Sequence, residues 1–152
     1  MKFSLQKTEL QKALQELALG VPNRSTLPIL SCGLFVLKGN NLAIRTTDLE
    51  ISLLLNITAN NPQDGTIAIP MAKLNEICSA MPEEEIHFET SDIGKLTIKN
   101  SVGNYTIMGH SPDEYPAEHK LGETTPLHID SDTLLFIILN TIYAVSKEDL
   151  KP

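Results

Sequence analysis

Two carboxylates, Asp48 and Glu50, lie two positions apart in the stretch TTDLEI. On a strand this spacing directs both side chains to one face, and paired carboxylates can perform acid–base chemistry. The same residues also fit a turn aspartate followed by a solvent-facing strand glutamate. No partner base or pocket motif accompanies them, so we favour the turn. An enzyme would require the two carboxyl groups to converge in a pocket with raised pKa values.

The other residues that could do chemistry are scattered. The four histidines are His87, His110, His119 and His128. They form no H-x-H or H-E-x-x-H pattern. The chain has no phosphate-binding loop, nucleophile elbow or dinucleotide motif. We therefore predict no catalytic residue, no metal site and no cofactor, and we expect His87 to face solvent from a strand. Cys32 and Cys78 lie far apart in apolar patterns, which predicts buried free thiols.

Composition narrows the class of protein. Among 152 residues, 41% are hydrophobic and 20% are charged, which is typical of a globular protein rather than a disordered one. The longest apolar run, Leu134–Leu139, is too short to span a bilayer, and the N-terminus is unlike a signal peptide. These features predict a cytoplasmic protein without a membrane partner. The net charge of −7 argues against bulk electrostatic attraction to nucleic acid.

Two segments have the apolar spacing of an amphipathic helix. The first segment is KTELQKALQELALG, with Pro22 shortly after it. The second is MAKLNEICSAMP, which directly follows Pro70 and ends with Pro82. Their apolar stripes are Leu10, Ala13, Leu14 and Leu17, and Leu74, Ile77, Cys78 and Met81. Each helix must bury its stripe against another element.

Alternating residues predict antiparallel strands. One face of each strand carries the apolar residues Leu49, Ile51, Leu53, Leu55 and Ile57; Ile86 and Phe88; Leu96 and Ile98; and Tyr105 and Ile107. The turn sequences KGNN, SDIG and SVGN lie between such runs. We predict an α+β fold in which two helices pack on one face of an antiparallel sheet.

The last part of the chain repeats its beginning. A linker rich in proline and charge, SPDEYPAEHKLGETTP, precedes a segment that matches the apolar positions of the N-terminus at an offset of 124 residues. We therefore predict a first domain at residues 1–122 and the beginning of a second, truncated domain at residues 123–152. In the apolar helix Leu134–Ile142, the side chains of Leu135, Phe136 and Leu139 lie beyond a single stripe and could pack against a neighbouring molecule.

The motifs MKFSLQKTEL, NRSTLPIL, TTDLEI, IPMAKLNEIC and SPDEYP, in this order and spacing, resemble the bacterial DNA polymerase III beta subunits, the sliding clamps. The resemblance implies a DNA-clamp fold and a non-catalytic processivity factor. It also implies a head-to-tail ring homodimer that surrounds duplex DNA, tethers polymerase III subunits and is opened by a clamp loader. Because a ring holds DNA by topology, an acidic net charge is compatible with this role.

The resemblance also implies roles for single residues. Arg24 and the segment that contains Lys147 and Lys151 match loops that face DNA, while Lys73 and Tyr105 match the interface with the partner's third domain. From residue type alone, a solvated loop charge is the favoured interpretation of Arg24, and only the resemblance makes a DNA contact an equal alternative. Lys73 could be a solvated helix residue, and Tyr105 could be half-buried sheet packing. The family's peptide pocket lies between its second and third domains, so we expect this chain neither to bind clamp-binding peptides nor to encircle DNA. The alternative interpretation is an unrelated α+β protein-interaction module.

Overall fold

The computed structural model describes residues 1–22, 24–91, 94–118 and 125–146. The chain divides into two units, Met1–Ala117 and Glu118–Pro152, and each is described by itself. Within the described residues, the first unit contains the helices α1 (Lys7–Leu17) and α2 (Met71–Ala80). Its strands are β1 (Lys2–Gln6), β2 (Cys32–Lys38), β3 (Asn41–Thr47), β4 (Ser52–Thr58), β5 (Asn60–Gln63), β6 (Gly65–Pro70), β7 (Glu85–Thr90), β8 (Lys95–Lys99) and β9 (Asn104–Met108).

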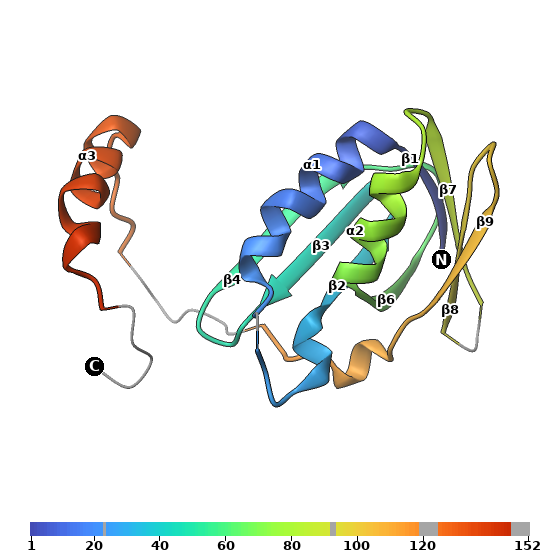
Figure 1. Cartoon of the computed structure of the whole chain (residues 1–152), viewed down its shortest axis with the longest axis horizontal. Helices are drawn as coiled ribbons and strands as arrows, with labels where there is room; N and C mark the ends of the chain where they lie inside the picture. Colours follow the sequence, from blue (N-terminus) through green and yellow to red (C-terminus); the bar gives the residue numbers. More distant parts are fainter. Residues whose placement is uncertain (23, 92–93, 119–124, 147–152) are drawn as a thin grey trace. The chain divides into compact units, whose positions relative to one another are not determined.

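The strands form two antiparallel sheets. One has the order β5-β1-β7-β8-β9 and the other the order β4-β3-β2-β6. Figure 1 shows α1 and α2 side by side over the strands; α1 contacts β3 and β4, and α2 contacts β6 and β9. The predicted α+β class is confirmed, with two sheets where a single one was expected. The difference arises because the chain changes sheet after β1, after β4, after β5 and after β6.

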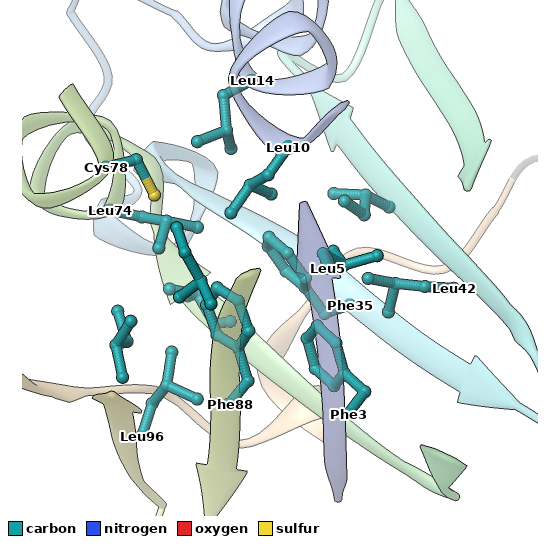
Figure 2. Packing of buried hydrophobic residues seen from close by; sticks show 14 of the residues in the cluster. Phe3, Leu5, Leu10, Leu14, Phe35, Leu42, Leu74, Cys78, Phe88 and Leu96 are labelled. Atoms are coloured by element: carbon teal, nitrogen blue, oxygen red, sulfur yellow. The ribbon is translucent and has the colours of Figure 1, made fainter. Parts of the chain in front are cut away.

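Both sheets and both helices contribute to one apolar core, and Figure 2 shows part of it. Phe3 on β1 lies opposite Phe88 on β7, and their rings stack with centroids 4.7 Å apart. The predicted stripe of α1 is buried along its whole length, whereas Ile77 in the stripe of α2 is only partly buried. The helical spacing and the strand alternation therefore identified part of this core, whereas its residues on β2, β3 and β6 were not predicted.

The start of β4 differs from the prediction. Leu49 and Ile51 were expected on the apolar face of a strand, but both are exposed and the strand begins at Ser52. The carboxylate of Asp48 accepts hydrogen bonds from the backbone N–H groups of Glu50 and Ile51, at 3.0 and 2.7 Å, which closes a turn. Leu49 has a φ of 83° in this turn. Side-chain capping of the turn therefore overrides the alternation of residue types.

The second unit contains α3 (Ser131–Thr141) and the 3-10 turn η4 (Ile142–Ala144). These two elements begin and end 124 residues after α1 and the 3-10 turn η1 (Ala18–Gly20). Residues 126–130, which correspond to β1, are described but form no strand. Among the residues that the structure describes, no helix has the length and apolarity needed to cross a membrane.

Candidate nucleic-acid and subunit surfaces

The loop that carries Arg24 leaves α1 through η1 and ends in the 3-10 turn η2 (Pro28–Ser31). Its root is attached to β3, because the hydroxyl of Thr46 donates a hydrogen bond to the carbonyl of Leu17 at 2.8 Å. A Cβ atom on Gly20 would lie 2.6 Å from the Thr46 hydroxyl oxygen. Only a glycine allows this close approach, so the start of the loop has a defined position.

The far end of the loop is also fixed. Leu30 is buried, and the hydroxyl of Ser31 donates to the carbonyl of Pro28 at 2.7 Å. Between these attachments Arg24 is exposed, and it makes no hydrogen bond or ion pair with any residue that the structure describes. A guanidinium in this situation can bind a phosphate through two parallel hydrogen bonds.

The exposed surface of α1 and α2 is not cationic. Lys7 is largely buried, and its ammonium group forms a 2.8 Å ion pair with Glu83, so this lysine is a structural residue rather than a solvated one. The remaining charged residues of the two helices are exposed, and they are Lys12, Lys73, Glu9, Glu16 and Glu76. Carboxylates therefore outnumber cations on the exposed faces of these helices.

The two residues matched to the subunit interface lie on neighbouring elements. Lys73 is exposed on α2, and Tyr105 is partly buried on β9, and these two elements contact each other. β9 is the last strand of the five-stranded sheet, as an interface strand would require. Its outer backbone groups can pair with another strand, because an edge strand presents unpaired N–H and C=O groups.

Two predicted DNA-facing residues, Lys147 and Lys151, lie outside the described residues. The carboxylate pair, by contrast, is fully described. Hydrogen bonds from Ile51 and Glu50 lower the pKa of Asp48, and Glu50 is exposed. The enzyme hypothesis required converging carboxyls with raised pKa values and is wrong. No group of three or more His, Cys, Asp or Glu that could hold a metal ion occurs in the described part of the chain.

The sequence patterns predicted no role for Tyr115 or Arg45. The hydroxyl of Tyr115 lies 3.2 Å from the carbonyl oxygen of Cys32 and 3.1 Å from that of Arg45, so its one proton is shared between the two acceptors. The Arg45 guanidinium lies over the Tyr115 ring, 5.3 Å from its centroid, and donates to the carbonyl of Pro116. This anchor binds the end of the first unit to β2 and β3, so residues through Pro116 are not a free linker.

Both cysteines are free and buried, as predicted. Burial raises the pKa of Cys78 to about 12, although the Lys7 ammonium opposes this effect. Burial also raises the pKa of Tyr115 to about 12, against the effect of Arg45. These groups are neutral near pH 7 and belong to the packing. His87 is exposed on β7, also as predicted.

The sequence model of a known family, described as "DNA polymerase III beta subunit, N-terminal domain", matches residues 1–119. The chain belongs to this family. A beta sliding clamp from Pseudomonas putida is 29% identical over 152 residues, covering 99% of this chain and 41% of the relative. A beta sliding clamp from Bacillus subtilis is 26% identical and covers 100% of this chain and 42% of the relative.

Solved structures agree with the family assignment. The crystal structure of DNA polymerase III subunit beta from Pseudomonas aeruginosa has a TM-score of 0.90 at 28% identity, covering 99% of this chain and 41% of that one. The DNA polymerase sliding clamp from Bacillus subtilis has a TM-score of 0.92 at 26% identity, covering 100% and 42%. The predicted clamp fold is confirmed, and the hypothesis of an unrelated interaction module is wrong. The chain spans about two-fifths of the length of these relatives.

Proposed function

We propose that this chain is the first domain and the beginning of the second domain of a DNA sliding clamp. The whole protein would be a non-catalytic processivity factor that acts in the cytoplasm. Two copies would close head to tail around duplex DNA, and a clamp loader would open and close the ring. The ring would tether the polymerase III subunits. The proposal is supported chiefly by the family match over residues 1–119, together with the similarity to whole-clamp structures over nearly all of the chain.

The surface charge fits sliding better than tight binding. The exposed faces of α1 and α2 carry more carboxylates than cations, which rules out strong phosphate attraction along the helices. A topological ring needs little binding energy, and tight phosphate contacts would slow its movement. Arg24, exposed on a loop that is attached at Leu17 and at Leu30, would then supply a local contact to the DNA backbone.

The remaining residues take their proposed roles from the same assignment. Lys147 and Lys151 would contact phosphate in the second domain, which would begin near residue 123. Tyr105 and Lys73 would meet the third domain of the partner chain. The edge position of β9 and the contact of α2 with β9 support this interface. The 152-residue chain alone would neither encircle DNA nor bind clamp-binding peptides.

A chimera tests the proposal. This chain would replace the corresponding first part of the Pseudomonas putida clamp, and the product would be loaded onto a nicked circular plasmid by its clamp loader. We expect a ring that stays on the circle and leaves when the plasmid is cut. A ring that leaves circular and linear DNA equally fast would contradict the proposal. So would micromolar binding of a clamp-binding peptide to the 152-residue chain alone.

A chimera carrying Arg24→Ala tests the DNA contact separately. We expect it to load several-fold less well at low salt, and this difference should shrink as salt rises, because salt weakens the phosphate contact in the parent. Retention on the circle should stay unchanged, because retention depends on ring closure. A matched Lys38→Ala chimera, which removes an exposed cation from the end of β2, should load like the parent. Equal loading of both variants would contradict the role of Arg24.

A further inference from the structure

The motif TTDLEI places two buried threonines next to each other at the end of β3, and their hydroxyl groups bind different parts of the fold. The hydroxyl of Thr47 donates to the carbonyl of Ile51 at 2.8 Å and accepts from the N–H of Leu49 at 3.0 Å. Thr47 therefore holds the turn between β3 and β4, as Asp48 does. The hydroxyl of Thr46 instead binds the end of α1.

Thr46 is attached at the point where the Arg24 loop begins. Its hydroxyl donates at 2.8 Å to the carbonyl of Leu17, the last residue of α1. The last carbonyls of a helix lack partners within the helix, so a side-chain donor there determines where the chain turns away. At Gly20, a Cβ atom would lie 2.6 Å from the Thr46 hydroxyl oxygen and 3.1 Å from the Leu53 side chain. η1 therefore packs on β3 and β4, and Thr46 is its hydrogen-bonded attachment.

Arg24 lies between this attachment and Leu30. Val21 packs partly on the core, and Leu30 is buried. The N–H of Leu27 donates to the Ser25 hydroxyl at 3.0 Å, and the N–H of Leu30 donates to the Leu27 carbonyl at 3.2 Å. These two hydrogen bonds join loop residues to one another, so they shape the loop without attaching it to the sheets. The position of Arg24 relative to the sheets therefore depends on η1.

We propose that Thr46 is a positioning residue for the DNA contact of Arg24, a step that rests on the proposed function. Valine and threonine have nearly the same shape, so what threonine adds at this buried position is the hydrogen bond to Leu17. A guanidinium that is held in place before binding loses less conformational entropy when it contacts a phosphate. The motifs NRSTLPIL and TTDLEI then act together, since one supplies the guanidinium and the other holds the base of its loop.

The first measurement is NMR of the 152-residue chain without DNA. Thr46→Val removes the hydroxyl and keeps a β-branched side chain, whereas Thr46→Ser keeps the hydroxyl. The matched control, Thr47→Val, removes a buried hydroxyl from the next residue of the same strand. In Thr46→Val we expect the amide signals of Ser25 and Leu27 to shift and their order parameters to fall. Thr46→Ser and Thr47→Val should leave both unchanged. Gly20→Ala, whose methyl group would displace the same hydrogen bond, should shift the same signals.

The second measurement is loading of the chimera at low salt, with urea unfolding to verify that each variant is folded. Thr46→Val should load several-fold less well than the parent, while Thr46→Ser and Thr47→Val should load like it. Adding Thr46→Val to Arg24→Ala should cause no further loss, because both changes remove one contact. A residue that acted only through stability would lower loading further in the double variant.

Unchanged loop signals in Thr46→Val and Gly20→Ala would overturn the proposal. So would full loading of Thr46→Val when Arg24→Ala is impaired. If Arg24→Ala itself loads like the parent, the DNA contact and this proposal are both wrong. Retention of the parent ring on the circle is measured in the same experiment, and it tests the proposed clamp function independently of Thr46.

Discussion

α1 and α3 have equivalent positions in the two units but differ in how far they are buried. Each has eleven residues followed by a three-residue 3-10 turn, and the two are 124 residues apart. α1 is the less apolar helix, yet it buries a full stripe, while α3 has no buried residue. The difference shows that burial depends on the strands that cover a helix rather than on its own hydrophobicity. α1 has two sheets and α2 around it, whereas the described part of the second unit supplies no strand.

The largest effect is expected when a side chain is shortened to alanine at the same repeat position in each helix. Leu14→Ala should lower the free energy of unfolding of the first unit by about 2–5 kcal/mol, because it leaves a cavity in the core. Ile138→Ala should change that free energy by less than about 0.5 kcal/mol, because Ile138 belongs to the second unit. Urea unfolding followed by amide NMR signals of β7 measures both. Equal losses would mean that α3 packs on the first unit.

Ionisation should also distinguish the two units, since both cysteines lie in the first. The pKa of Cys78 rises from 9.0 to about 12 on folding, because the thiol is buried. Above pH 9 the unfolded chain loses this proton while the folded chain keeps it. Stability of the first unit should therefore fall by roughly 1 kcal/mol per pH unit up to about pH 12.

Tyr115, whose pKa rises from 10.0 to about 12, should steepen this loss above pH 10. Urea unfolding of the parent and of Cys78→Ala, at half-unit steps from pH 7 to 11, measures the slope. The variant is less stable near neutral pH, but its curve should fall less steeply than that of the parent above pH 9, because Cys32, whose pKa burial also raises, is then the remaining buried thiol. Parallel curves for the two proteins would show that the thiol is not the titrating group.

The sequence predicted those parts of the fold that depend on local spacing. The stripes of α1 and α2 and the alternation around Phe88 and Ile98 required only residue periodicity. The division into two sheets could not be predicted, because β4 and β5 are separated by a single residue and nothing local indicates the change of sheet. The motif NRSTLPIL was enough to single out Arg24. The ion pair of Lys7 with Glu83 could not be predicted, because the two residues are 76 positions apart.

The anchor of Tyr115 was missed for the same reason. Its partners lie 70 and 83 residues earlier in the chain, so no local pattern reveals them. The one available signal in the sequence was a tyrosine in the proline-rich segment SPDEYP. If such a tyrosine is buried, its hydroxyl requires a hydrogen-bond partner. The number of exposed cations on α1 was also only partly predictable, because Lys7 is buried and paired with Glu83.

A smaller effect is expected from hydroxyl removal at two tyrosines, one in each unit. Tyr115→Phe retains the ring beneath Arg45 but leaves the carbonyls of Cys32 and Arg45 without this donor, which should cost about 1–2 kcal/mol of stability. Tyr143→Phe, in the 3-10 turn η4 where the side chain is exposed, should have no measurable effect on the first unit. Urea unfolding compares the two. An unchanged midpoint for Tyr115→Phe would mean that the anchor contributes nothing to stability.

The smallest effect concerns how each helix begins. The carboxylate of Asp130 accepts from the backbone N–H groups of Asp132 and Thr133, at 3.1 and 3.3 Å. α1 has no side-chain cap at Gln6, and the N–H of Lys7 instead donates to the carbonyl of Glu84 at 3.0 Å. Asp130→Ala should therefore destabilise α3 by about 1 kcal/mol, while Gln6→Ala should leave α1 unchanged.

The measurement is the set of Cα chemical shifts over Ser131–Thr141 and Lys7–Leu17, compared between the parent chain and each single variant. A helix with few tertiary contacts depends on its cap, because isolated helices of this length are marginal in water. If α3 keeps its full helical shifts in Asp130→Ala, contacts other than the cap must hold it. If α3 loses them while α1 keeps its shifts in Gln6→Ala, the cap stabilises α3 where the sheets stabilise α1.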